Sequence, residues 1–217
     1  MIAALVPVKP LRDAKSRLRP LLLDSQRRAL AVAMLEDILR LLRGVPGILM
    51  TAVVSRDPDA QSLARSLGVQ AIAAPPEAHG VNQALRYATD IIVRQGASVL
   101  LVLPMDVPLA SKGDIQAIVE ATWENPSVVV CRSRRGGVNA VAMQPPGVIP
   151  FHFGYRGLAA HRREAAARRV PYKVLEIPSL SFDVDRPEDL KALLHLPRSS
   201  RSQRILDAMG LDPESMG

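Results

Sequence analysis

The sequence predicts an α/β protein built on a mostly parallel, twisted sheet with helices on both faces. The first observation behind this prediction is that apolar runs of strand length alternate with amphipathic helical segments along the chain. The second is that these runs are almost continuously apolar, as expected of strands buried on both faces. The 217 residues contain no internal repeat and no interdomain linker, so we expect a single domain over residues 1–196 and a peripheral or flexible tail over residues 197–217.

The first two elements are a strand and a long helix. The apolar run Ile2–Val8 has the length of a strand and leads into a loop that contains proline. Asp24 is expected to cap a helix over residues 25–43, in which apolar residues recur at helical spacing. Gly44 closes this helix, since glycine is favoured just past a helix C-terminus.

Proline and glycine mark the next elements. A buried strand is expected at 48–54. Asp57, followed by proline, then opens a short helix that Gly68 closes, because proline is favoured at the first helical position and glycine just past the last one. A strand at 69–74 and a helix at 81–94 follow.

The second half of the chain carries the same kinds of signal. Residues 98–103 form a buried apolar run, and Ser111 with Asp114 resembles a capping box for a helix over 115–123. The remaining expected elements are strands at 128–131, 139–143 and 172–176 and helices at 155–169 and 187–194.

Composition excludes several kinds of site and partner. Aromatic residues make up only 3% of the chain, which counts against a platform for stacking the bases of single-stranded nucleic acid. The single cysteine, Cys131, excludes an internal disulfide, a cysteine-based zinc site and an iron–sulfur cluster. Any metal is therefore expected to be held by oxygen. There is no signal peptide and no apolar stretch of about 20 residues, so we expect a cytoplasmic protein without a membrane partner.

The net charge of +7 is confined to one part of the chain. Residues 132–173 contain nine basic residues and one acidic residue, a balance of +8, and the rest of the chain sums to −1. Basic regions of this kind occur in nucleic-acid-binding proteins. An RNA-binding module is therefore one alternative function.

Three segments fall where a parallel sheet places its ligands, outside the carboxyl ends of its strands. The first is the loop over residues 9–19, which carries Lys9, Lys15 and Arg17 among five basic side chains. This charge suits a triphosphate, and a solvated loop is an equally good interpretation. The chain has neither a P-loop nor a glycine-rich dinucleotide motif at this place.

The other two segments carry aspartates. Asp106 ends a buried apolar run between two prolines, and a carboxylate fixed there suits Mg²⁺, which takes one or two carboxylates with phosphate oxygens and water. The alternative is an aspartate that organises a turn. Asp183 and Asp185 alternate at an expected strand end and so face the same side, where one of them could complete a metal site. Asp185 could equally start the next helix.

Taken together, these segments resemble the 2-phospho-L-lactate and phosphoenolpyruvate guanylyltransferases that make the deazaflavin coenzyme F-420. The resemblance covers about residues 2–195. Its most distinctive parts are Ala14-Lys15-Ser16-Arg17-Leu18 and Asp183-Val184-Asp185-Arg186-Pro187-Glu188-Asp189-Leu190. The other matching segments are Val6-Pro7-Val8-Lys9, Val81-Asn82-Gln83-Ala84-Leu85, Pro104-Met105-Asp106-Val107-Pro108-Leu109, Gly136-Gly137-Val138-Asn139-Ala140 and Phe153-Gly154 with His161.

The resemblance implies a nucleotidyltransferase of the MobA-like, glycosyltransferase-A type. It implies GTP as donor and a three-carbon phospho-acid, phosphoenolpyruvate or 2-phospho-L-lactate, as acceptor, with release of pyrophosphate. Lys9, Lys15 and Arg17 would lie along the GTP phosphates, and Lys15 with Arg17 would stabilise the departing pyrophosphate. Asn82 would lie near the nucleotide. Asp106 and one of the two later aspartates, Asp183 or Asp185, would hold Mg²⁺.

Two departures affect the region that binds the acceptor in this family. Relatives often have Gly-Thr-Asn where this chain has Gly137-Val138-Asn139, and Phe-Gly-Pro-x-Ser where it has Phe153-Gly154-Tyr155-Arg156-Gly157. Each change removes a hydroxyl. An acceptor dianion still needs donors when it leaves water. We therefore expect backbone N–H groups and an arginine to replace the hydroxyls, Arg156 before Arg134 or Arg135.

Related nucleotidyltransferases are the second enzymatic interpretation, with 3-phosphoglycerate, a molybdenum cofactor or a sugar phosphate as acceptor. They usually have a glycine-rich loop after the first strand, whereas the loop here is basic and lacks glycine. The expected partners are thus small molecules and not nucleic acid. A homodimer is compatible with the sequence.

Overall fold

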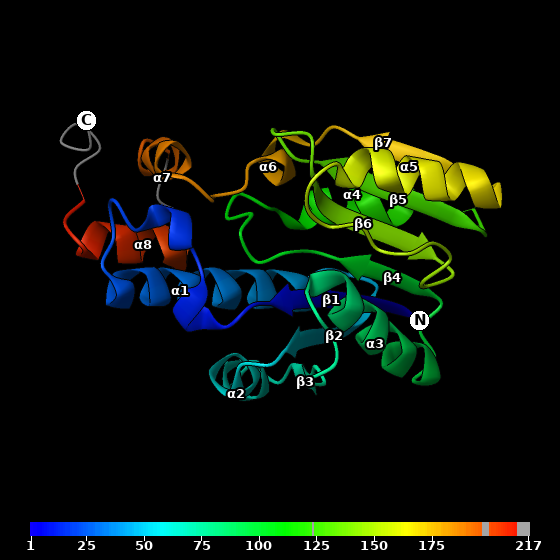
Figure 1. Ribbon diagram of the computed structural model, residues 1–217, viewed down its shortest axis with the longest axis horizontal. Coiled ribbons are helices and arrows are strands. Elements are labelled where there is room, and N and C mark those ends of the chain that lie inside the picture. Colours follow the sequence, from blue (N-terminus) through cyan, green and yellow to red (C-terminus); the bar gives the residue numbers. More distant parts are fainter. Residues whose placement is uncertain (123, 197–199, 212–217) are drawn as a thin grey trace.

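The computed structural model describes residues 1–122, 124–196 and 200–211. Within these residues, seven strands form one sheet in the order β3-β2-β1-β4-β6-β5-β7 (Figure 1). The strands are β1 (Ile2–Val8), β2 (Ile48–Ser55), β3 (Gln70–Ala73), β4 (Val99–Val102), β5 (Ser127–Arg132), β6 (Val138–Gln144) and β7 (Tyr172–Leu175).

The sheet is mostly parallel, as predicted. The pairs β1–β2, β1–β4, β2–β3 and β5–β7 are parallel, whereas β6 runs antiparallel to both of its neighbours, β4 and β5. The short loop over residues 133–137 reverses the chain between β5 and β6 and so explains the single reversed strand.

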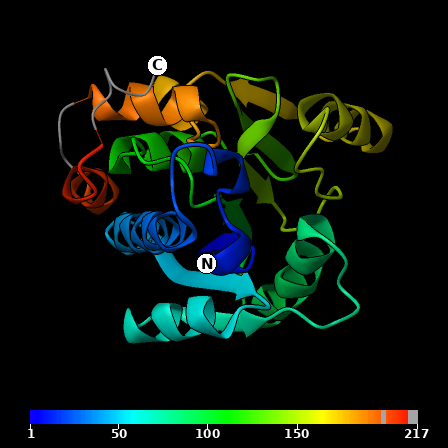
Figure 2. The same cartoon turned by 60° about the vertical axis from the view of Figure 1, so that its left-hand side comes forward.

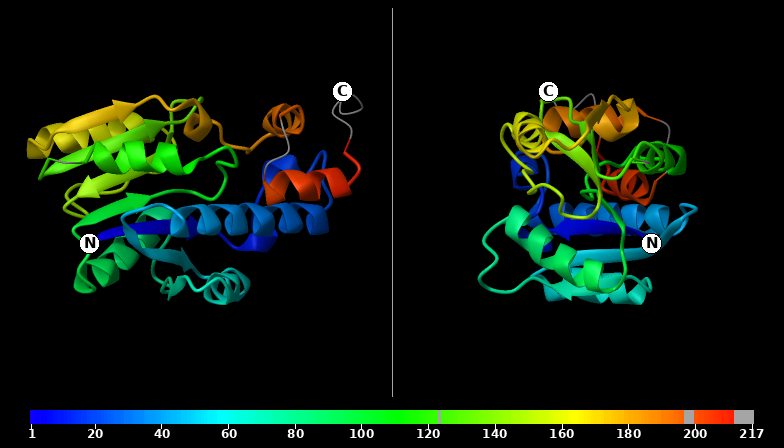
Figure 3. Two further views of the ribbon diagram at one scale, coloured as in Figure 1. Left: turned by 180° about the vertical axis from the view of Figure 1, so that it is seen from behind. Right: turned by 90° about the vertical axis from the view of Figure 1, so that its right-hand side faces the viewer.

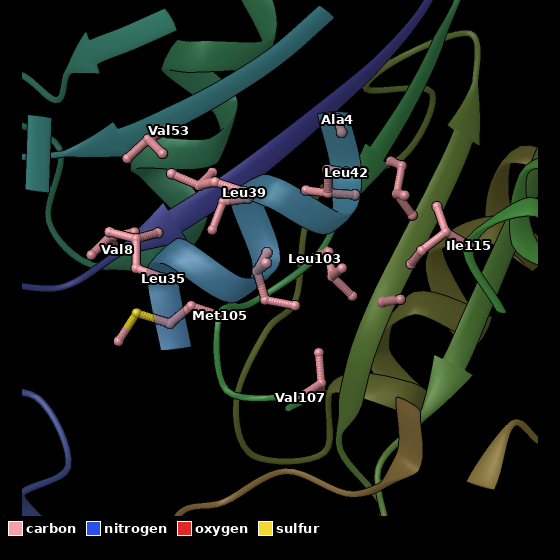
Figure 4. Close-up of a cluster of buried hydrophobic side chains, with 14 of the residues drawn as sticks. Ala4, Val8, Leu35, Leu39, Leu42, Val53, Leu103, Met105, Val107 and Ile115 are labelled. Atoms are coloured by element: carbon pink, nitrogen blue, oxygen red, sulfur yellow. The ribbon is translucent and has the colours of Figure 1, made fainter. Parts of the chain in front are cut away.

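Helices cover both faces of the sheet, because alternate strand residues point to opposite sides. On one face, α1 (Asp24–Arg43), α2 (Pro58–Ser66) and α4 (Lys112–Glu120) pack against Ala4, Val6 and neighbouring strand residues. Figure 4 shows part of this core, in which Leu35 of α1 lies beside Val8, Leu39 near Val53 and Leu42 near Ala4, while Ile115 of α4 lies at the other side of the same cluster. On the other face, α3 (Val81–Arg94) and α5 (Gly157–Arg168) pack against the intervening strand residues (Figure 3).

A third core lies beyond the carboxyl ends of the strands. It joins the loop after β1 to α1, to α7 (Pro187–Leu194) and to α8 (Arg201–Ala208), which lie together in Figure 2. Its buried members are Leu18, Leu22, Leu30, Met34, Phe182, Val184, Leu190, Leu193 and Leu206. This core carries the segments that hold the candidate site.

The described part of the expected tail is a packed helix. Leu206 of α8 is fully buried, and the Asp37 carboxylate of α1 accepts hydrogen bonds from the backbone N–H groups of Arg201 and Ser202, at 3.0 and 2.8 Å. The division of the chain into a domain over 1–196 and a tail stays a prediction. Among the helices of the described residues, none has the length and apolar character needed to cross a membrane.

Most predicted elements are confirmed, with four corrections. Asp24 is the first residue of α1 and not its cap; Leu23 precedes the helix, and its N–H donates to the Gln26 side chain at 2.9 Å. The helix expected over 155–169 is α5, which begins only at Gly157, because Arg156 has a left-handed backbone (φ 55°). The capping box at Ser111 is confirmed, but α4 ends at Glu120 and Trp123, the expected last residue, lies outside the described residues.

The fourth correction concerns Asp183 and Asp185. They lie in an extended segment between α6 (Pro178–Ser181) and α7, not at the end of a strand. One hydrogen bond, from the Val184 N–H to the Asp106 carbonyl oxygen at 2.9 Å, ties this segment to the chain after β4. Val184 is fully buried between the two aspartates, so the expected alternation exists without a strand.

Candidate active site

A cleft of about 650 Å³ opens at the carboxyl edge of the sheet, where the topology predicts a ligand site. The loop after β1, the ends of β2 and β3, and the start of α3 form its walls. Its lining residues include Lys9, Lys15, Arg17, Asp106, Gly154 and Asp185. The structure therefore brings together the basic loop and two of the three aspartates that the sequence singles out.

Lys15 ties three separate segments together. The loop after β1 consists of two short 3₁₀ turns, Leu11–Asp13 and Ser16–Leu18, with Lys15 between them in a left-handed conformation (φ 55°, ψ 33°). The Lys15 side chain is only 3% exposed, and its Nζ donates to Asp106 Oδ2 at 3.1 Å and to the Val184 carbonyl oxygen at 2.7 Å. One ammonium group thus joins the loop to the chain after β4 and to the segment before α7.

Two side chains that the sequence analysis missed as site residues hold this loop. The Leu11 N–H donates to Asp57 Oδ2 at 2.5 Å, and the Ala14 carbonyl oxygen accepts from Arg27 Nη1 at 3.0 Å. Asp57 stands out in the sequence only as the start of a helix. Arg27 lies in an amphipathic helix, where an arginine usually indicates a solvated face.

The three aspartates have different partners. Asp106 binds Lys15, and Asp185 pairs with the exposed Arg17 guanidinium at 2.5 Å. Asp183 accepts from Asn139 Nδ2 at 3.2 Å. Burial raises the pKa of the Asp183 carboxyl; the Asn139 hydrogen bond opposes this, and the negative charge of Asp106 raises the pKa further. Asp106 and Asp183 are therefore near enough to repel each other.

These two carboxylates fit Mg²⁺. Among the described residues, no group of three or more His, Cys, Asp or Glu side chains could hold a metal alone. Mg²⁺ does not require one, since it combines one or two carboxylates with phosphate oxygens and water. A cation between Asp106 and Asp183 would relieve their repulsion. Asp185 has a closer cationic partner than Asp183, since Arg17 lies 2.5 Å from Asp185 and Arg135 lies 3.7 Å from Asp183.

Two arginines expected as acceptor ligands bind within the protein. Arg134 lies 4.4 Å above the centre of the Phe182 ring. Arg135 donates to Asp189 at 2.7 Å and lies 3.7 Å from Asp183, and the Asp189 hydrogen bond raises the pKa of its guanidinium. Burial raises the pKa of Asp189, but Arg135 and two backbone N–H donors hold it below its usual value. Both arginines fasten the loop between β5 and β6 to the segment before α7.

The region expected to bind the acceptor divides into two parts. Gly154 lines the cleft, held there by Asn82, whose side chain accepts the Phe153 N–H at 2.8 Å and donates to the Phe153 carbonyl oxygen at 3.3 Å. Gly137 and Val138 lie outside the cleft lining, and Val138 is buried in the core under α5. Asn82 thus contacts the backbone of the cleft wall.

The two residues after Gly154 lie at the protein surface. The Tyr155 side chain is 90% exposed, and Arg156 Nε donates to the Tyr155 hydroxyl at 3.1 Å. Arg156 makes no ion pair among the described residues, in contrast to Arg135. Arg134 also makes none, and each of these two guanidinium groups lies over an aromatic ring, Arg134 over Phe182 and Arg156 over Tyr155 at 5.2 Å. Arg134 and Arg156 are therefore the two candidate arginines without a carboxylate partner among the described residues.

His161 holds both ends of the segment over residues 152–157. Its Nε2 accepts the His152 N–H at 3.1 Å, so its Nδ1 carries the proton and donates to the Gly157 carbonyl oxygen at 2.8 Å. Burial lowers the pKa of His161 to about 4. Gly157 is required here, since a side chain at this position would overlap the His152 carbonyl oxygen.

Part of the basic region is neutralised internally. Arg132, Arg135 and Arg168 each pair with a carboxylate of this chain, namely Glu176, Asp189 and Glu164. Glu164 is already counted in the balance of +8, but Glu176 and Asp189 lie outside residues 132–173 and reduce the charge that this region presents to a polyanion. The structure thus weakens the alternative of an RNA-binding module.

Comparison with known proteins identifies relatives over nearly the whole chain. The family model described as "Guanylyl transferase CofC like" matches residues 2–215. A phosphoenolpyruvate guanylyltransferase from Rubrobacter xylanophilus is 39% identical over 88% of this chain and 93% of its own length. A 2-phospho-L-lactate guanylyltransferase from Methanocaldococcus infernus is 27% identical over 97% and 92%.

The fold also matches solved structures. A crystal structure described as that of a nucleotide-diphospho-sugar transferase from Desulfovibrio desulfuricans G20 superimposes with a TM-score of 0.77 and covers 99% of this chain and 97% of that one. At 14% sequence identity, this likeness concerns the fold alone.

Proposed function

The chain belongs to the CofC-like guanylyl transferase family, and from this premise we propose that it transfers GMP from GTP to a small phospho-acid in coenzyme F-420 biosynthesis. Phosphoenolpyruvate is the acceptor we favour, because the relatives of 32–39% identity carry that name and those named for 2-phospho-L-lactate are 27% identical. The reaction would take place in the cytoplasm. The observation that supports the proposal is the Lys15–Asp106 pair in the cleft at the carboxyl edge of the sheet.

The chemistry is an in-line displacement at phosphorus. An oxygen of the acceptor phosphate forms a new bond to the α-phosphorus of GTP, and the bond from that phosphorus to the bridging oxygen breaks. Pyrophosphate leaves with the electron pair. A phosphate monoester is mostly ionised at neutral pH, since its second pKa is about 6, so no general base is required. Catalysis then consists of positioning and charge stabilisation.

The basic loop supplies the charge stabilisation. An ammonium group has three N–H donors, and Lys15 directs two of them to Asp106 and Val184, which leaves one for a phosphate oxygen. Arg17, oriented by Asp185, would bind the departing pyrophosphate together with Lys15. Lys9 would bind along the same phosphates from the cleft wall.

Mg²⁺ would be held by Asp106 and Asp183 and, when bound, would neutralise charge on the phosphate oxygens. Asp183 is preferred to Asp185, because the charge of Asp106 acts on Asp183 and because Arg17 lies closer to Asp185, at 2.5 Å, than Arg135 does to Asp183, at 3.7 Å. Asn82 would act on the acceptor side by fixing the backbone of Phe153 and Gly154 in the cleft wall.

Pyrophosphate release tests this function. The purified protein would be incubated with Mg²⁺, with each of the four nucleoside triphosphates, and with phosphoenolpyruvate, 2-phospho-L-lactate or 3-phosphoglycerate. We expect GTP with phosphoenolpyruvate to give the fastest release and a product whose mass is that of the GMP adduct. Equal turnover with ATP would contradict the choice of donor. Release no faster than that of the Asp106→Asn variant, for every pair, would contradict the function itself.

A further inference from the structure

Arg27 is a buried cation that contacts the basic loop after β1, residues 9–19. It lies on α1 with its side chain 1% exposed. Its Nη1 donates to the Ala14 carbonyl oxygen at 3.0 Å, and its Nη2 donates to Asp24, a side chain that is 91% exposed. Its Nε is buried and has no hydrogen-bond partner among the described residues.

Stability does not explain an arginine at this position. A buried guanidinium gives up its hydration, and apolar residues of similar volume usually serve a protein core as well or better. The carboxylate paired with Arg27 lies in solvent, and one of its donors is left unsatisfied. What the arginine uniquely provides is a donor that reaches the Ala14 carbonyl oxygen from within the core.

That carbonyl belongs to the residue directly before Lys15. A residue other than glycine with a left-handed backbone is strained, and it keeps this conformation only where its surroundings impose it. After Lys15, its carbonyl oxygen accepts the Leu18 N–H at 2.8 Å. Before Lys15, Arg27 holds the carbonyl of the Ala14–Lys15 peptide group. In the peptide group that precedes it, the Ala14 N–H donates to the Leu11 carbonyl oxygen at 3.3 Å.

We propose that Arg27 is a positioning residue that acts through Lys15. By holding the Ala14 carbonyl oxygen, it keeps Lys15 in its strained conformation and its ammonium group against Asp106 and Val184. The consequence for turnover rests on the proposed function, whereas the consequence for the Lys15 side chain does not. Without Arg27, the turn can relax and the Lys15 side chain becomes accessible to solvent.

Arg27→Met, which fills much of the same space but donates no hydrogen bond, tests this proposal with two readouts. The first is reductive methylation of the five lysines, quantified by peptide mass spectrometry, with exposed Lys9 as internal reference. We expect Lys15 to react at least about tenfold faster relative to Lys9 than in the wild type, because burial no longer protects it. The second is a kcat about tenfold lower, with the KM for phosphoenolpyruvate little changed.

Two neighbours on α1 are matched controls. Arg28→Gln changes an exposed arginine that pairs with Asp59, and Asp24→Asn removes the carboxylate partner of Arg27 while leaving the bond to Ala14. In both variants, we expect Lys15 to be methylated at the same rate as in the wild type and kcat to be unchanged. Labelling does not require turnover, so a wild type without transferase activity would contradict the proposed function and still leave the role of Arg27 decided.

A folded Arg27→Met protein with wild-type labelling of Lys15 would overturn the proposal. Folding is checked by circular dichroism and Tm. If Arg27→Met does not fold, Arg27→Gln, which keeps a polar end but is too short to reach Ala14, is measured in the same way. Failure of both variants to fold, with Arg28→Gln folded, would overturn the proposal in favour of a purely structural role.

Discussion

Lowering the pH from 7 to 5 should weaken the fold through His161, and His161→Gln should remove that part of the loss. In the folded protein, burial holds the pKa of His161 at about 4, and its Nε2 must stay unprotonated to accept the His152 N–H. In the unfolded chain the pKa of a histidine is about 6.5. Between these values the unfolded chain binds more protons. The free energy of unfolding therefore falls as the pH falls from 6.5 towards 4.

The size of the effect follows from the two pKa values. Linkage between pKa values of about 6.5 and 4 removes about 2 kcal/mol of unfolding free energy between pH 7 and pH 5, from His161 alone. For a chain of this length, that loss corresponds to a decrease in Tm of about 4–8 °C. The segment that would loosen is the one over residues 152–157, because His161 binds its backbone at both ends.

Urea unfolding at pH 7 and pH 5, for the wild type and for His161→Gln, measures this contribution. The change in unfolding free energy between pH 7 and pH 5 is compared between the two proteins. Asp183 and Asp189 titrate in both, so their contributions cancel in the difference. His79→Gln, at an exposed site, controls for the substitution itself. A pH effect in His161→Gln that equals that of the wild type within about 0.5 kcal/mol would refute the reasoning.

Three further substitutions probe the site. Asp106→Asn should nearly abolish pyrophosphate release with an unchanged circular dichroism spectrum, because it removes charge without creating a cavity; wild-type turnover at saturating Mg²⁺ would contradict this. Arg156→Ala should raise the KM for the acceptor about tenfold and leave that for GTP unchanged, which steady-state kinetics would show. Gly157→Ser should lower stability by about 1–3 kcal/mol in thermal unfolding, because its Cβ overlaps the His152 carbonyl oxygen; an unchanged Tm would exclude the overlap.

The local signals of the sequence predicted the elements well and their ends less well. Periodicity and glycine located the helix over 81–94 to the residue, and the Ser111 capping box is present. The start of α5 was wrong, because helical spacing does not reveal that Arg156 adopts a positive φ. The strand expected at Asp183 does not form, since among the described residues this segment makes a single backbone hydrogen bond to the chain after β4.

The sequence predicts where in the fold the candidate site lies, but not which of its side chains contact one another. The rule for parallel sheets brings the loop after β1 and Asp106 to one edge, and the structure confirms this. This rule does not predict that Lys15 binds Asp106, because residues 91 positions apart in the sequence leave no periodic signal. For the same reason Arg135 could be counted as a free ligand, although Asp189 already binds it.

The third core has a consequence for how the protein is made. It packs Leu18, from the basic loop, against Phe182, Leu193 and Leu206 from the last part of the chain. Synthesis proceeds from the N-terminus, so the basic loop leaves the ribosome early and its packing partners leave last. The loop can reach its final conformation only after translation is nearly complete. A nascent chain therefore exposes the basic loop long before its packing partners are made, and a chain truncated before α7 would have the sheet without the third core that holds this loop.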